Sequence, residues 1–114
     1  MPLVHWLDDL PPRARDKCLV RLERLEELGH ELRRPEADYL RDDVYELRAK
    51  HQRMNYRMLY FFHGREAVVV SHGFAKQQAA VPVIEIEHAI RRMRSFRADP
   101  RRHAFETSEK GEEG

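Results

Sequence analysis

The stretch YELRAKHQRMNYRMLYFF, residues 45–62, contains two segments of the kind a sheet buries, yet charged residues stand inside both of them. Tyrosine and phenylalanine are enriched in strands, whereas charged residues there are depleted and are costly to bury without a partner. The charges are Glu46, Arg48 and Arg57. They either face water or belong to a surface that binds a ligand.

Strands are predicted at 44–49 and 54–62, and a third is predicted at 67–74. The segments AKHQR and HGR lie between them and supply the turns, which gives a three-stranded antiparallel meander. The valines at 68–70 form a continuous apolar run. We therefore expect the third strand to be the best covered of the three.

Helices are predicted both before and after these strands in the sequence. Residues 2–10 carry apolar side chains at helical spacing, and residues 12–28 form an amphipathic helix that Gly29 ends. A last helix is predicted at 82–97. The single cysteine, Cys18, lies on the apolar stripe of the second helix, so we expect a buried thiol and no intramolecular disulfide.

The segment 30–43 is polar and without sustained periodicity, so it is predicted to be a connection, with Tyr39 and Leu40 packed against the core. The resulting fold class is α+β, with two N-terminal helices packed on a small antiparallel sheet and followed by a C-terminal helix. Residues 1–103 are predicted to form one domain, and residues 104–114 a flexible acidic tail.

Charge is distributed unevenly along the chain. Residues 1–43 hold 8 Lys and Arg against 11 Asp and Glu, whereas residues 44–103 hold 12 against 5. This asymmetry suggests a polyanionic partner on one side, most simply nucleic acid. Neither a signal peptide nor a membrane span is visible, which predicts a soluble cytoplasmic protein. The seven histidines include no i, i+4 ligand pair, so we expect no metal and no cofactor.

Side chains alternate between the two faces of a strand, which places Glu46 and Arg48 on the same face. Arg57 points away from the apolar face of its own strand. If the front helices cover one face of the sheet, the charges gather on the other, beside His72 or Lys76. Strand register is left open by the sequence.

The chain resembles the RelE/ParE superfamily of bacterial toxin–antitoxin toxins, in its phage-derived HigB-like branch. The resemblance covers roughly residues 3–97 and lies in the order of several segments: WLDDLPPRARDK (6–17), YELR (45–48), NYRMLYFF (55–62), SHGFAK (71–76), Pro82 and the run 85–92. It implies a RelE-like fold and a toxin that cuts mRNA within the ribosome, held inactive by a small helix-turn-helix antitoxin. A second copy of the chain is a further candidate partner.

Such an mRNA interferase cleaves RNA through attack by a 2′-hydroxyl, which needs a proton acceptor, cations around the phosphate and a proton donor, but no metal. The resemblance assigns the scissile phosphate to Arg57 and added charge or acid catalysis to Lys76. Glu46 is the candidate base, and His72 is a second candidate for proton transfer. The RNA-binding candidates are Arg48, Lys50 and Arg53.

Each assignment has a structural alternative. Glu46 and Arg57 would also fit a cross-strand ion pair without catalytic function. Arg48 would fit a network with the acidic front helices, and His72 a half-buried histidine with its hydrogen bonds satisfied.

The chain departs from the superfamily pattern at two places. Relatives usually begin with a strand before the first helix, which is expected to be absent here, and they carry a second basic residue where Gln77 stands. The alternative function is therefore a binding protein without catalysis, either a ParE-like inhibitor of DNA gyrase or a degenerate toxin that acts with its antitoxin in repression.

Overall fold

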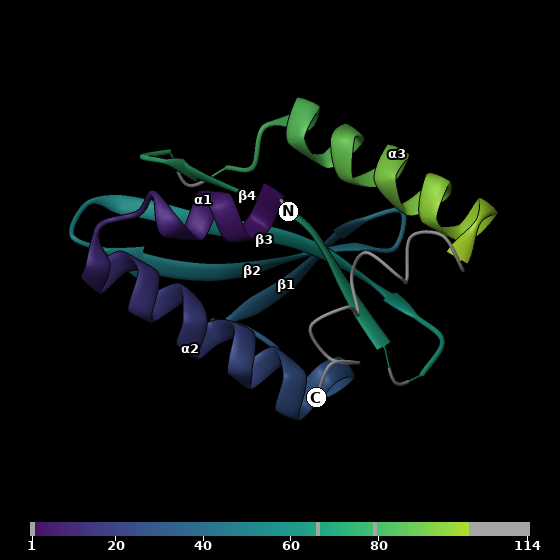
Figure 1. Ribbon diagram of the computed structural model, residues 1–114, viewed down its shortest axis with the longest axis horizontal. Helices are drawn as coiled ribbons and strands as arrows, with labels where there is room; N and C mark the ends of the chain where they lie inside the picture. Colours follow the sequence, from purple (N-terminus) through teal and green to yellow (C-terminus); the bar gives the residue numbers. More distant parts are fainter. Residues whose placement is uncertain (1, 66, 79, 101–114) are drawn as a thin grey trace.

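Helices cover both faces of a four-stranded antiparallel sheet in the computed structural model, which describes residues 2–65, 67–78 and 80–100 (Figure 1). The predicted α+β class is confirmed, and the arrangement is consistent with a RelE-like fold. The expected acidic tail lies outside the described residues. The elements are α1 (Pro2–Asp8), α2 (Pro12–Leu28), the short 3-10 helix η1 (Gly29–Glu31), β1 (Ala37–Arg41), β2 (Val44–His51), β3 (Met54–His63), β4 (Ala67–Lys76) and α3 (Val83–Ala98).

The strands follow one another in chain order, β1-β2-β3-β4, so the predicted meander is present with one strand more than expected. The prediction of a connection throughout 30–43 was wrong at β1. Asp42 and Asp43 make a two-residue turn with φ of 52° and 70°, the backbone that a type I′ hairpin turn needs. Tyr39 is 51% exposed rather than packed in the core, although its ring contacts Tyr45 edge-on.

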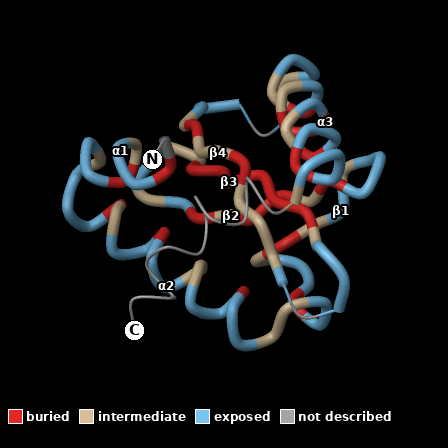
Figure 2. The backbone as a smooth tube through the Cα atoms, turned by 45° about the vertical axis from the view of Figure 1, so that its right-hand side comes forward, coloured by how far each residue is buried: buried red, intermediate tan, exposed pale blue. Residues whose placement is uncertain are grey.

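The best-covered strand is β3, in which every residue from Tyr56 to Phe61 is buried. The expectation that the valines at 68–70 lie in the best-covered strand was wrong, because β4 is at the edge of the sheet and all three are only half-buried. Figure 2 shows the buried residues concentrated along the central strands and the inner side of α3. The middle of the sheet therefore anchors both layers of helices.

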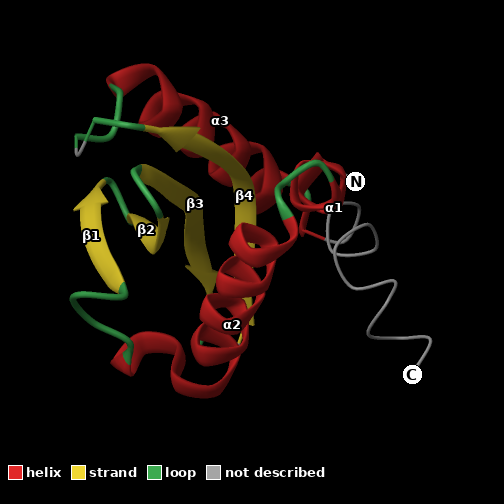
Figure 3. Ribbon diagram, turned by 90° about the vertical axis from the view of Figure 1, so that its left-hand side faces the viewer, coloured by secondary structure: helices red, strands yellow, loops and turns green. Residues whose placement is uncertain are grey.

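One face of the sheet is covered by α1 and α2, which lie on the opposite side from α3 (Figures 1 and 3). Cys18 is fully buried in this layer, as predicted. The backbone of Gly73 touches Trp6 of α1, since a Cβ at that position would lie 2.4 Å from the indole ring. The apolar residues of this layer include Leu3, Leu7, Ala14, Cys18, Leu25, Leu47, Met58 and Tyr60.

The other face is covered only in part, by α3. The apolar cluster under α3 takes Val44 from β2, Leu59 and Phe61 from β3, and Phe74 from β4. Glu46 and Arg48 follow Val44 on this same face of β2. The charged residues of the opening stretch are therefore the continuation of the surface on which α3 packs.

No helix within residues 2–65, 67–78 and 80–100 is long and apolar enough to cross a membrane.

In the described part of the chain every buried side-chain nitrogen or oxygen has a hydrogen-bond partner. The buried charges on the sheet therefore have partners within the fold.

Candidate nucleic-acid interface

The strand register arranges the candidate residues in three rows across the sheet. Antiparallel neighbours lie directly opposite one another, so each row joins one residue from each of β2, β3 and β4 on the partly covered face. The rows are Glu46–Leu59–His72, Arg48–Arg57–Phe74 and Lys50–Asn55–Lys76. The first row holds the carboxylate, the other two rows hold two cations each, and the last row places a lysine on each side of an asparagine.

Glu46 and Arg57 form a buried ion pair that crosses diagonally between the first two rows. The Arg57 guanidinium donates a hydrogen bond from Nη1 to Glu46 Oε1. The residues are 3% and 5% exposed, so neither charge is open to bulk water. The cross-strand ion pair named above as the structural alternative is therefore present in the fold, and Arg57 is buried beneath the charged surface.

Arg48 shares the same carboxylate. Its Nε lies 3.5 Å from Glu46 Oε2, and its side chain is 35% exposed. The expected network between Arg48 and the acidic front helices is not what the structure has. Arg21 of α2 instead donates from Nε to the backbone carbonyl of Arg48 at 2.8 Å, and pairs with Glu36. The Arg48 side chain is left on the far face, toward solvent.

Exposed cations complete the surface. Lys76 ends β4, Lys50 precedes the end of β2, and Arg53 lies in the tight turn between β2 and β3. Asn55, between the two lysines, donates from Nδ2 to the Gln77 carbonyl at 3.0 Å and so ties the segment after β4 to the sheet. The register thereby brings four basic residues to one end of one face, with Arg53 in the turn at that end: Arg48, Lys50, Arg57 and Lys76.

His72 is separated from Glu46 by Leu59 and contacts α3 instead. Its Nε2 lies 2.8 Å from Glu85 Oε1, and its Nδ1 lies 2.8 Å from Ser71 Oγ. Burial lowers the pKa of His72, the Glu85 carboxylate opposes that shift, and nearby His88 adds to it. His72 is thus a neutral, half-buried histidine at neutral pH, with both ring nitrogens in hydrogen bonds.

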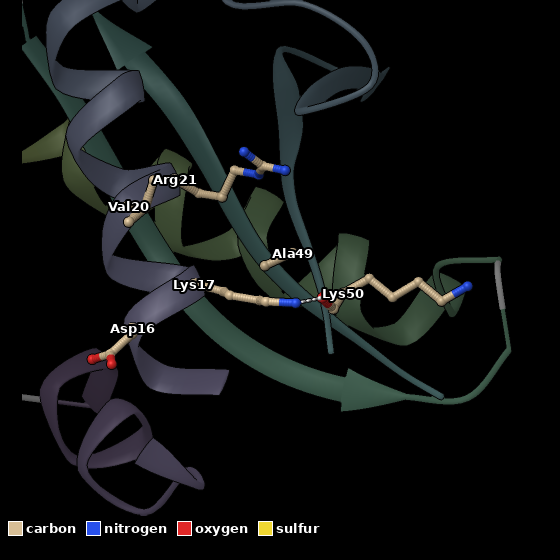
Figure 4. Close-up of a pocket in the computed structure, with 6 residues that line it drawn as sticks. All are labelled: Asp16, Lys17, Val20, Arg21, Ala49 and Lys50. Carbon is tan, nitrogen blue, oxygen red and sulfur yellow. Dashed lines mark hydrogen bonds between the residues drawn. The ribbon is translucent and has the colours of Figure 1, made fainter. Parts of the chain in front are cut away.

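A pocket of about 280 Å³ lies on the opposite side of the sheet, between α2 and β2 (Figure 4). Val20 and Ala49 form part of its wall. The Lys17 ammonium donates to the Lys50 carbonyl at 3.2 Å, while the Lys50 side chain extends away from the pocket (Figure 4). The pocket therefore lies on the other side of the sheet from the charged face, and the Lys17 ammonium is engaged with the backbone.

Sequence reasoning brought most of these residues together but missed two. The structure collects Glu46, Arg48 and Arg57 as expected, and places Lys76 one row away. Glu85 and His88 were not predicted, although they join His72 through the packing of α3. The signal was available as the i, i+3 spacing E-I-E-H at 85–88, which puts both side chains on one helix face.

A family model described as "Phage derived protein Gp49-like (DUF891)" matches residues 5–94. The chain belongs to the phage-derived Gp49-like family. A search of the curated proteins found no match. The matched range runs from α1 through most of α3 and includes all of the candidate residues. Membership of this family is consistent with a toxin of a toxin–antitoxin system in general.

Proposed function

We propose that this Gp49-like protein is the toxin of a type II toxin–antitoxin system, of the RelE/ParE superfamily and its HigB-like branch, and that it cleaves mRNA on the ribosome in the cytoplasm. The observation that carries the proposal is the basic end of the partly covered sheet face. Arg48, Lys50, Arg57 and Lys76 lie there beside Glu46, and Asp38 of β1 lies opposite Glu46. A surface of this kind suits the phosphate backbone of RNA.

The roles follow from exposure and pairing. Arg48 and Lys76 both reach solvent, so we assign them to the phosphates on either side of the cleaved bond, and the planar Arg48 fork suits phosphate oxygens. Arg57 is buried and paired with Glu46, so this pair positions Arg48. Lys50 and Arg53 extend the track for the RNA strand.

The proposed chemistry uses the RNA's own 2′-hydroxyl. A base takes the 2′-hydroxyl proton, the 2′-oxygen bonds to phosphorus, and the bond to the 5′-oxygen breaks. That oxygen receives a proton, for which Lys76 is the candidate donor. The products are a 2′,3′-cyclic phosphate and a 5′-hydroxyl. Of the two candidate bases, Glu46 is buried between two guanidinium groups, whereas His72 is neutral. We assign proton acceptance to His72 and a positioning role to Glu46.

The proposed partner is a small helix-turn-helix antitoxin that covers the basic face. An acidic or helical segment laid across the face that α3 leaves open would neutralise Arg48 and Lys76 and exclude RNA. The domain is proposed to span residues 1–103, which contains the whole matched range. Inhibition by steric and electrostatic cover requires no change in the fold of the toxin.

Controlled expression in a bacterial host tests this function. We expect growth arrest with loss of intact mRNA, and rescue when a small helix-turn-helix reading frame adjoining the gene is co-expressed. Fragments with 5′-hydroxyl ends should accept an adaptor only after phosphorylation. Intact mRNA accompanied by DNA damage would instead identify a gyrase inhibitor. A free chain without toxicity that still acts with its antitoxin in repression would identify a non-catalytic subunit of a repressor.

A further inference from the structure

We propose that His72, Glu85 and His88 form a binding site for a divalent transition metal, with Zn²⁺ as the ion that their side chains suit best. His72 comes from the edge strand β4, whereas Glu85 and His88 come from the first two turns of α3. One ligand atom from each residue lies within 4.8 Å of the other two. The site would therefore link the last helix to the sheet.

The donor set is the main argument for zinc. Two imidazoles and one carboxylate are the protein ligands of a well-known class of zinc sites, in which the fourth position is held by water or substrate. A Glu-x-x-His pair on one helix turn, as at 85–88, is also a recurring ligand arrangement in metal-binding helical bundles. Imidazole nitrogen selects for zinc, copper and nickel over magnesium or calcium.

The present spacing is close to what coordination requires. Bonds of about 2.1 Å at tetrahedral angles place ligand atoms about 3.4 Å apart. His72 Nε2 and Glu85 Oε1 are 2.8 Å apart. The ring centroids of His72 and His88 lie 4.7 Å apart, and the two ring planes make an angle of 31°. Small side-chain rotations would therefore admit an ion between the three groups. All three residues are half-buried, which leaves access from solvent.

Ser71 supplies the outer partner that metal-bound histidines commonly have. Its hydroxyl lies 2.8 Å from His72 Nδ1 and can either donate or accept a hydrogen bond. Without metal, His72 donates from Nε2 to Glu85 and accepts from Ser71 at Nδ1. With metal on Nε2, the ring proton resides on Nδ1 and is donated to Ser71. The neutral ring changes tautomer, with no net release of a proton. The zinc-bound ring has no free nitrogen lone pair, so only the metal-free form can act as the proton acceptor of the proposed function.

One charge opposes the ion. Arg92 donates from Nη1 to the Ser71 carbonyl at 3.0 Å, and its positive charge acts on His72. The Glu85 carboxylate lies in direct contact with the ring and offsets that charge. A Glu85→Gln variant keeps the side-chain shape while removing this compensation, so it should weaken metal binding more than the loss of one ligand atom alone.

Calorimetric titration of the untagged, chelator-treated full chain with Zn²⁺ tests the proposal. We expect one ion per chain, and affinity reduced by more than ~10-fold in His88→Ala, since loss of even an outer partner weakens metal sites by about 10- to 100-fold. Glu85→Gln should behave in the same way. His5→Ala removes an exposed helical histidine elsewhere and serves as the matched control, with unchanged affinity.

Long-range ¹H–¹⁵N NMR correlations of the histidine rings provide a second readout. On addition of Zn²⁺, His72 should change to the tautomer protonated at Nδ1, while the His5 ring keeps its spectrum. The proposal is overturned if wild type binds no zinc, or if His88→Ala binds as tightly as wild type while its circular dichroism is native. Both measurements are independent of RNA cleavage, so a chain without nuclease activity would still give a clear answer.

Discussion

Arg57 on β3 donates a hydrogen bond to Glu46 on β2, although the two residues do not lie opposite one another in the strand register. Glu46 is opposite Leu59, and Arg57 is opposite Arg48. The ion pair is therefore diagonal, which leaves the second carboxylate oxygen of Glu46 near Arg48. One buried carboxylate thus connects a buried arginine with one that reaches solvent.

Removal of either member of the buried pair should destabilise the fold. Breaking such a pair leaves a buried charge without its partner, at a cost of about 3–5 kcal/mol. We expect Arg57→Ala to lower the free energy of unfolding in urea by this amount. The double variant Glu46→Gln with Arg57→Met should lose less than the two single losses together. Arg41→Ala, which breaks the exposed pair with Asp42, serves as the control. Equal stability of Arg57→Ala and wild type would contradict the buried pair.

Gly73→Ala should disturb the packing of α1. The added Cβ would meet the indole ring of Trp6 at 2.4 Å, so the ring or the helix must shift. Overpacking of this kind costs about 1–3 kcal/mol. Trp6 is the single tryptophan, so its fluorescence reports the shift directly. Gly73→Ala combined with Trp6→Leu should regain part of the stability; an unchanged spectrum in Gly73→Ala would show that the contact is absent.

Cys18 should be unreactive in the native protein. It is fully buried, and burial raises its pKa to about 11, so little thiolate forms at neutral pH. We expect iodoacetamide to modify it only when the chain opens, at a rate that rises steeply in urea. Mass spectrometry after timed quenching measures this rate. Modification of the folded chain as fast as a small free thiol would contradict the placement of α2.

The bridges of Glu36 to α2 should contribute stability only above acidic pH. Its carboxylate accepts hydrogen bonds from Arg24 and Arg21, and the Arg24 bond lowers its pKa in the folded state. A depressed folded pKa adds stability above the unfolded value, and this stability is lost as pH falls through the folded value. Wild type should therefore melt above Glu36→Gln at pH 7, and the two melting curves should converge in acid. A constant difference down to low pH would argue against this linkage.

Much of the fold follows from local pattern. Helical periodicity predicted α2 and α3 almost to their ends, and alternation predicted which face each charge occupies. β1 was missed because five residues with one exposed tyrosine at a sheet edge give a weak pattern. Its turn, Asp42-Asp43, was the available signal, since aspartate tolerates the positive φ that a tight hairpin requires.

The candidate site was predictable in membership but not in burial. The sequence analysis treated Arg57 and Lys76 alike, as cations at the phosphate. The fold, however, buries Arg57 and exposes Lys76. Burial depends on how far α3 extends over the sheet and on the diagonal ion pair, and both are tertiary relationships. The cluster of His72 with Glu85 and His88 likewise depends on α3 docking against β4 rather than on any one segment.

Primer extension on mRNA incubated with purified protein and translating ribosomes tests the central claim most directly. The informative variant is Arg48→Gln with Lys76→Gln, which removes the two cations assigned to the phosphates beside the cleaved bond and leaves the Glu46–Arg57 pair in place. Arg13→Gln on the exposed side of α2 is the control. We predict new 5′ ends with wild type and with the control, only when ribosomes are present, and none with the double variant at an unchanged melting temperature. Intact mRNA with wild type, or full cleavage by the folded double variant, would contradict the account.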